Sequence, residues 1–163
     1  MAVEIERKFL VTSEAWRTGA SVTPIRQGYI LASPEKSVRV RTKGDLGFIT
    51  VKAERQGAGT NEFEYEIPLT DANELLELAC EHPIIDKLRF ERDEHGHRWE
   101  IDLFKGANSG LVIAEVELKS ADESVDLPDW VGEEVTTDPK YLNANLFKNP
   151  YQNWVQLPQQ EKP

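Results

Sequence analysis

Charged and apolar residues alternate with a period of two along most of this chain. Arg39 and Arg41 flank Val40, and Glu115 and Glu117 flank Val116. Residues two apart on an extended strand project from the same face, so each charged pair shares one face and the apolar residue takes the other. The expected strands are 3–11, 25–31, 37–43, 48–55, 62–69, 85–93, 98–104 and 111–120. The expected helices are 13–17, 71–81 and 139–148.

The faces opposite the charges are apolar on nearly every expected strand. Val40, Ile49, Phe90, Ile101 and Val116 are examples. So much apolar surface needs a cover, while the charged face must line a space of its own. We therefore predict an α+β fold in which about eight antiparallel strands close into a barrel. A few helices cover the apolar outer face, and the lumen forms a charged tunnel.

The chain length of 163 residues fits one domain with a substantial core. We place that domain at 1–150 and expect residues 151–163, rich in Gln and Pro, to form a loosely ordered tail. Cys80 is the only cysteine, which excludes an internal disulfide. With no secretory pattern and no run of about 20 apolar residues, we expect a cytoplasmic protein.

The formal net charge of −10 argues against some partners and leaves others open. A strongly acidic protein is a poor ligand for nucleic acid or for an anionic membrane surface, so we expect neither. A small phosphate compound held inside the lumen is compatible with this charge. There, local bases and bound cations decide the electrostatics.

Bases and acids are sorted onto separate strands of the predicted inner face. The bases are Lys8, Arg39, Arg41, Lys52, Lys87 and Arg89. The acids are Glu4, Glu6, Glu64, Glu66, Asp102, Glu115 and Glu117, with Glu62 and Glu100 as additions. Arginine and lysine suit phosphate oxygens, and paired carboxylates suit Mg²⁺ or Mn²⁺. Together they indicate a site for a metal-bridged chain of phosphates. A structural sheet whose exposed face carries cross-strand salt bridges is the alternative interpretation.

Residues 4–8, with the sequence EIERK, resemble the ExExK signature that opens proteins of the CYTH superfamily, the triphosphate tunnel metalloenzymes. The later elements follow in the family's order and extend the likeness to about residue 148. They are Arg39-Val40-Arg41, Lys52, Glu64-Tyr65-Glu66, Lys87-Leu88-Arg89, Asp102 and Glu115-Val116-Glu117. The chain is most similar to the short, single-domain bacterial members that hydrolyse inorganic tripolyphosphate.

The resemblance implies a role for each matching residue. It assigns the divalent ions, expected to be two Mg²⁺ or Mn²⁺, to Glu4, Glu6, Asp102, Glu115 and Glu117. It assigns substrate binding to Lys8, Tyr29, Arg39, Arg41, Lys52, Lys87, Arg89 and Lys140, and a supporting role to Glu64 and Glu66. The residues expected to be most important for catalysis are Glu4, Glu6, Lys8, Lys52, Lys87 and Glu117. His82, His95 and His97 match no site of the family.

The expected activity is metal-dependent hydrolysis of tripolyphosphate to pyrophosphate and phosphate. Thiamine triphosphatase and class IV adenylate cyclase activities use the same tunnel in this superfamily and stay open as alternatives. RNA is disfavoured as a substrate by the acidic charge. A non-catalytic polyphosphate-binding module is a further alternative, and the sequence leaves a homodimer open.

Overall fold

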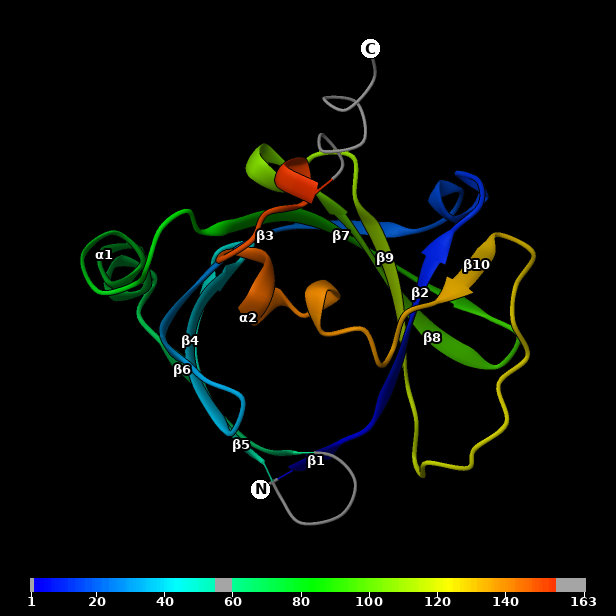
Figure 1. Cartoon of the computed structure of the whole chain (residues 1–163), viewed down its shortest axis with the longest axis horizontal. Coiled ribbons are helices and arrows are strands. Elements are labelled where there is room, and N and C mark those ends of the chain that lie inside the picture. The colour runs from blue at the N-terminus through cyan, green and yellow to red at the C-terminus, as the bar shows by residue number, and fades with distance from the viewer. Residues whose placement is uncertain (1, 55–59, 155–163) are drawn as a thin grey trace.

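In the part of the chain that the structure describes, ten antiparallel strands form one curved sheet that wraps around a central space (Figure 1). The computed structural model describes residues 2–54 and 60–154. The strands pair in the order β1-β6-β5-β4-β3-β7-β8-β9-β2-β10. Their bounds are β1 Ala2–Glu4, β2 Glu6–Val11, β3 Ser21–Ala32, β4 Lys36–Lys43, β5 Leu46–Glu54, β6 Thr60–Ile67, β7 Ile85–Glu94, β8 His97–Phe104, β9 Val112–Glu117 and β10 Val131–Glu134. The predicted α+β class and antiparallel pairing are confirmed.

The expectation of a closed barrel is wrong, because the ladder of paired strands is open. Within the described residues, β1 lies at one end of the strand order and β10 at the other. β1 pairs with β6 while β2 pairs with β9, and only Ile5 separates β1 from β2. The expected strand 3–11 is therefore two strands, since its halves pair with neighbours at different ends of the sheet. The two sides of the open sheet are linked by the chain itself, which runs from β1 through Ile5 into β2, and not by hydrogen bonds between the described strands.

Helix α1 covers the outer face of β4 and β5, as the sequence predicted for that apolar surface. α1 spans Leu69–Leu78, and its Ala72 and Leu76 are buried against Val40 in one apolar cluster. A Cβ atom at Gly47 on β5 would lie 2.7 Å from the Cβ of Ala72. Glycine at this position therefore permits the close packing of α1 on the sheet.

A second apolar cluster covers the outer face of β2, β7, β8 and β9. Trp99 on β8 is fully buried and packs between Phe9 of β2 and Trp130, with ring centroids 5.9 and 5.4 Å apart. Trp16 covers Phe90 from a 3-10 turn, Ala15–Arg17 (η1), at a centroid distance of 4.9 Å. The expected helix 13–17 is only this one turn. A 3-10 turn and irregular segments, instead of an α-helix, thus cover this part of the outer face.

A third apolar cluster lies on the inner face, where the sequence analysis expected only charge. Register places Ile85 on the same face of β7 as Lys87, and Phe104 opposite Lys87 on β8. The C-terminal segment 139–147 covers these side chains from within the ring (Figure 1). It contributes Leu146 and Phe147, both buried. One part of the ring is therefore filled by an apolar core, and the charged residues line the remainder.

The segment 139–148 forms two short helical pieces instead of the one helix expected. A 3-10 turn, Pro139–Tyr141 (η3), is followed by α2, Asn143–Leu146. Leu142 between them is extended, with φ −72° and ψ 136°. This break turns the chain so that Leu146 reaches the inner core while Asn143 faces the charged cavity.

Three further features complete the fold. β10 was not predicted, and a 3-10 turn, Gly106–Asn108 (η2), links β8 to β9. Tyr151 and Trp154 pack against the inner apolar cluster, and the rest of the expected tail, 155–163, lies outside the described residues. Within the described ranges, no helix combines the length and apolar character needed to span a membrane.

Replacing Leu146 by Ala should destabilise the fold through the inner core. Leu146 has no exposed surface, so truncation removes buried methyl groups and leaves a cavity. Such changes cost about 2–5 kcal/mol of unfolding free energy. Urea unfolding followed by circular dichroism measures this value. The same change at Leu78, whose exposed fraction is 81%, is the control and should leave stability nearly unchanged. Equal effects at both positions would contradict the assignment of Leu146 to a packed core.

Candidate active site

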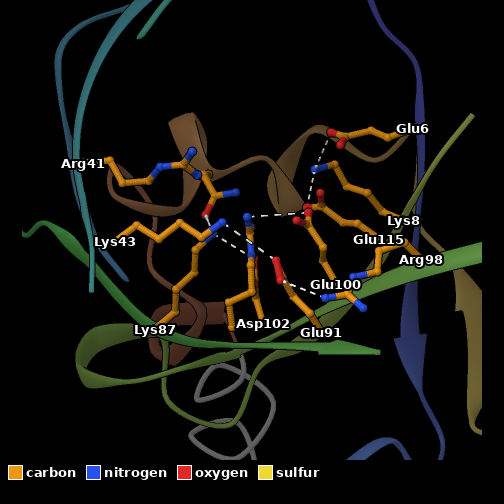
Figure 2. A network of polar contacts seen from close by, with 12 residues as sticks. Glu6, Lys8, Arg41, Lys43, Lys87, Glu91, Arg98, Glu100, Asp102 and Glu115 are labelled. Atoms are coloured by element: carbon orange, nitrogen blue, oxygen red, sulfur yellow. Dashed lines mark hydrogen bonds and ion pairs between the residues drawn. The ribbon is translucent and has the colours of Figure 1, made fainter. Parts of the chain in front are cut away.

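A cavity of about 610 Å³ lies against the inner face of the sheet, and most of its lining is charged. The cations lie mainly on β4, β5 and β7, and the carboxylates mainly on β2, β6, β8 and β9. The charged lining residues are Glu6, Lys8, Glu35, Lys36, Arg39, Arg41, Lys43, Lys52, Glu54, Glu62, Glu64, Lys87, Arg89, Arg98, Glu100, Glu115 and Glu117. The predicted sorting of bases and acids is therefore present in the folded chain, and Figure 2 shows part of this network.

Strand register builds the acidic wall of the cavity. Glu6 on β2 lies opposite Glu117 on β9. Glu115, two residues along β9, lies opposite Glu100 on β8. Paired positions share a face of the sheet, so all four carboxylates line the cavity. The period-two spacing of the sequence thus becomes a cluster of oxygen donors on three adjacent strands.

Lys8 is buried between two of these carboxylates. Its Nζ lies 2.9 Å from Glu115 Oε1 and 3.2 Å from Glu6 Oε1 (Figure 2). Burial alone would lower the pKa of Lys8, but the charges of Glu115 and Glu6 outweigh it and raise the pKa above its ordinary value. Burial pushes the pKa of Glu115 upward, but Lys8 and other cations prevail and lower it to about 2. Both groups are therefore charged at neutral pH.

The acidic wall suits a hard divalent cation. Carboxylate oxygens are the ligands that Mg²⁺ and Mn²⁺ prefer, and Glu6, Glu115 and Glu117 present them to one space. Among the side chains that the structure describes, no three carboxylates already stand in metal-binding geometry. Glu4 belongs to β1, with its backbone opposite Thr60, and its side chain lies outside the description. The donor types fit such an ion, with Lys8 neutralising part of their charge.

Arginines and a threonine on β4 and β5 form the basic wall. Arg39 Nη2 donates to Thr50 Oγ1 at 3.3 Å, and Thr50 Oγ1 donates to Glu64 Oε2 at 2.9 Å. Arg41 Nη2 lies 3.3 Å from the same Glu64 oxygen. One carboxylate thus serves two guanidinium groups. In the described part of the chain, the Nε atoms of Arg39 and Arg41 are buried without a hydrogen-bond partner.

The charge of Arg41 is poorly compensated by the protein alone. Burial is the main cause that lowers its pKa to about 10, and the nearby charges of Arg39 and Arg89 add to the effect. Glu64 and Glu100 offset it only in part. A bound polyanion would supply the missing negative charge.

Lys87 and Arg89 form the floor of the cavity on β7, above the buried Asp102 of β8. Arg89 donates to both carboxylate oxygens of Asp102, at 2.8 and 2.9 Å. Lys87 Nζ lies 2.8 Å from Asp102 Oδ2 and donates to Asn143 Oδ1 at 3.3 Å. Burial and Arg89 outweigh the attraction of Asp102 and lower the pKa of Lys87 to about 8.

This pKa predicts an alkaline limit to activity on a polyanion. With this pKa, Lys87 loses its positive charge progressively as the pH rises through about 8, so its attraction for a polyanion falls. We expect kcat/KM for tripolyphosphate to fall above about pH 8. A profile of kcat/KM from pH 6.5 to 10, at saturating Mg²⁺, measures this. A flat profile through pH 10 would contradict the assignment of Lys87 to substrate binding.

The cavity brings together most of the residues that the sequence singled out. Those that line it are Glu6, Lys8, Tyr29, Arg39, Arg41, Lys52, Glu64, Lys87, Arg89, Glu115 and Glu117. The two additional acids, Glu62 and Glu100, line it as well. The roles of these residues stay predictions.

The other predicted site residues lie elsewhere. Asp102 is 1% exposed and lies beneath the floor instead of on the lining. Glu66 shares a strand face with Glu64 and lies opposite Phe48, and neither Glu66 nor Phe48 is among the described lining residues. The ammonium of Lys140, on η3, packs on the ring of Trp154 at 4.6 Å, outside the lining. The geometry therefore gives no support to a direct substrate contact by Lys140.

Several lining residues were missed by the sequence analysis. Lys43 follows Arg41 by two residues, and Thr50 precedes Lys52 by two, so period-two spacing could have found both. Thr136, Arg98 and Asn143 also line the cavity. Asn143 carries no sequence signal, because only the tertiary path of the C-terminal segment brings it to Lys87.

The histidines take no part in the cavity. His97 Nε2 lies 2.7 Å from Glu123 Oε2, and His95 Nδ1 lies 3.2 Å from Asp126 Oδ2. His82 is exposed and contacts the backbone oxygen of Glu77 at 3.4 Å.

Fold and site together define a curved antiparallel sheet with an inner cavity whose cations suit a small polyanion and whose carboxylates suit hard cations. Comparison with known proteins agrees with this class. The family model described as the CYTH domain matches residues 2–150. The chain belongs to the CYTH family.

Two relatives and one solved structure extend the comparison. The chain is 51% identical to an inorganic triphosphatase of Acetivibrio thermocellus, over 94% of this chain and 99% of the relative. It is 39% identical to an inorganic triphosphatase of Nitrosomonas europaea, over 88% and 95% of the two chains. The crystal structure of an inorganic triphosphatase superposes with a TM-score of 0.67 and 36% identity, covering 90% of this chain and 95% of that one.

Proposed function

We propose that this protein hydrolyses inorganic tripolyphosphate to pyrophosphate and phosphate with the help of divalent metal ions. One observation carries the proposal: a single cavity joins a wall of cations to a wall of carboxylates. A linear triphosphate needs cations along its length, and its metal ions need oxygen ligands. The two relatives named inorganic triphosphatases support the same activity.

The acidic wall is the proposed metal site. Glu6, Glu115 and Glu117, together with Glu4, would hold one or two Mg²⁺ or Mn²⁺ ions. A bound divalent ion supplies neutralisation of phosphate charge and a lowered pKa of bound water. Lys8, placed between Glu6 and Glu115, limits the repulsion among these carboxylates.

The basic wall and the floor would bind the phosphate chain. Arg39 and Arg41 present guanidinium groups from β4, and Lys52 lines the cavity from β5. Lys87 and Arg89 approach from β7. Phosphoryl transfer depends on positioning and on neutralising charge that develops on the transferred and leaving groups. Fixed, partly desolvated cations meet both needs.

Inorganic tripolyphosphate is favoured over thiamine triphosphate or ATP by the lining of the cavity. An aromatic or purine ring needs a flat partner on which to stack. Among the described lining residues Tyr29 is the only aromatic one, and its ring already stacks on Phe147 at 5.4 Å. Three bare phosphates need only the charges that the cavity supplies.

A non-catalytic binding module is the second candidate. Binding a polyphosphate requires bases alone, whereas this cavity also carries the acidic wall, which favours the hydrolase over the binding module.

The cytoplasmic location and the homodimer stay predictions.

A substrate panel tests the proposal. Phosphate release should be measured from tripolyphosphate, pyrophosphate, thiamine triphosphate and ATP, each with Mg²⁺, Mn²⁺ or EDTA. We expect rapid, metal-dependent release from tripolyphosphate and much slower release from the others. Preference for thiamine triphosphate or ATP would overturn the choice of substrate. A rise in melting temperature with tripolyphosphate and Mg²⁺, but without turnover, would instead identify a binding module.

A further inference from the structure

Asp102 of β8 is enclosed by the cations that form the floor of the cavity. Its Oδ1 accepts from Arg89 Nε at 2.8 Å. Its Oδ2 accepts from Arg89 Nη2 at 2.9 Å and lies 2.8 Å from Lys87 Nζ. The residue is 1% exposed, and the described lining of the cavity does not include it. Both oxygens are therefore engaged on the side that faces the cavity.

Such a carboxylate is badly placed to bind a metal ion in the cavity. An ion that reached it would have to displace the bidentate Arg89 contact and bring a second cationic charge beside Lys87. Paired, buried charges are costly to separate, because each then lacks its partner in a poorly solvated place. Glu115 and Glu117, by contrast, line the cavity directly.

Lys87 contacts Asp102 and Asn143, and its Nζ also lies over the ring of Phe104 at 5.4 Å. A lysine ammonium has three N–H donors. Asp102 accepts one and Asn143 Oδ1 accepts another, at 3.3 Å. Lys87 is only 1% exposed, but unlike Asp102 it belongs to the lining of the cavity, which leaves its third donor as the one for a ligand there. Asn143 comes from α2, on the segment that Leu146 anchors in the inner core.

We propose that Asp102 and Asn143 are positioning residues that fix Lys87 and Arg89 against the substrate, and that Asp102 is not a metal ligand. The proposal rests on the proposed function of the cavity. Displacement of a catalytic group by about 1 Å can reduce a rate about 100-fold, so fixed supports for these cations matter. The C-terminal segment thus contributes a residue that acts on the reaction through Lys87.

Asn143 allows a matched pair of variants. Asn143→Asp keeps an oxygen acceptor beside Lys87, whereas Asn143→Leu has nearly the same volume without one. We expect Asn143→Leu to lower kcat/KM for tripolyphosphate about tenfold. Asn143→Asp should stay within about threefold of the wild type. Circular dichroism and melting temperature should show both folded. Equal kcat/KM in the two variants would overturn the role of Asn143.

Asp102→Asn tests the assignment of the carboxylate. Mn²⁺ affinity, measured by titration without substrate, should stay within about twofold of the wild type, while kcat/KM falls about 100-fold. Glu117→Gln, as the comparison, should weaken Mn²⁺ binding. Loss of Mn²⁺ affinity in folded Asp102→Asn as large as in Glu117→Gln would overturn the proposal. If the wild type fails to hydrolyse tripolyphosphate, the proposed function fails, and the Mn²⁺ comparison still decides whether Asp102 is a ligand.

Discussion

Replacing Glu117 by Gln is expected to reduce kcat for tripolyphosphate by about 100-fold or more while the fold stays intact. Glu117 lies on the acidic wall opposite Glu6, and its side chain is exposed to the cavity. Glutamine keeps the size of the side chain but removes the negative charge that a divalent ion requires. Glu4→Gln should act in the same direction if Glu4 shares the metal site. Steady-state kinetics over a range of Mg²⁺ concentrations measures both effects.

Glu74→Gln is the matched control for Glu117→Gln. Glu74 is an exposed residue of α1, on the outer side of the sheet, and should tolerate the change without loss of activity. Added Mg²⁺ should partly restore Glu117→Gln if the loss lies in metal affinity. Unchanged activity in both Glu117→Gln and Glu4→Gln would contradict the metal site.

Arg41→Ala should produce the second large effect, a fall of about 100-fold in kcat/KM for tripolyphosphate. The guanidinium of Arg41 is mostly buried, and in the described structure its Nε has no hydrogen-bond partner. Among the ion pairs of the described residues, Arg41 contacts Glu64, which also serves Arg39. A bound phosphate chain would complete these contacts, so removing Arg41 removes binding energy that the wild type gains only with the ligand.

Arg26→Ala provides the comparison for Arg41→Ala. Arg26 lies on the neighbouring strand β3 and is exposed, outside the cavity lining. The Arg26→Ala variant should retain wild-type kinetics, because it removes one arginine charge at a place outside the cavity. Isothermal titration of tripolyphosphate in EDTA, where the proposed metal-dependent hydrolysis is stopped, separates binding from turnover. Equal kinetics in both variants would contradict the assignment of Arg41 to substrate binding.

The period-two alternation predicted the strands and the charged inner face well. The reason is local: a strand sends residues such as Glu115 and Glu117 to one face whatever its neighbours are. The strand register then placed inward-facing residues of neighbouring strands opposite one another, so that Lys8 lies opposite Glu115. The order of charges along each strand thus carried most of the information about the site.

Two features could not be read from the same pattern: that the strand ladder is open, and that an apolar core fills part of the inner face. Alternation reports which face a residue takes, but it does not report whether the end strands pair. The expected first strand is interrupted at Ile5, and its two parts pair with different neighbours, β1 with β6 and β2 with β9. Ile85 and Phe104 share the face of the charged residues, and only the tertiary path of segment 139–147 shows that they are buried there.

The contacts of Asp102 and Asn143 also could not be predicted from the alternation of charged and apolar residues. Asp102 satisfies the spacing of an inner-face acid, yet Lys87 and Arg89 cover it. The alternation does not show whether an inward carboxylate meets solvent or a neighbouring base. Asn143 arrives from more than 50 residues away in sequence, at a separation of 56 from Lys87.

Phosphorus NMR of the purified protein with tripolyphosphate tests the central claim most directly. With Mg²⁺ present, we expect the tripolyphosphate resonances to be replaced by pyrophosphate and phosphate in equal molar amounts. EDTA should stop the conversion, and Glu117→Gln should slow it strongly. Persistence of intact tripolyphosphate with Mg²⁺ or Mn²⁺, in a protein shown to be folded, would contradict the assignment of this cavity to triphosphate hydrolysis.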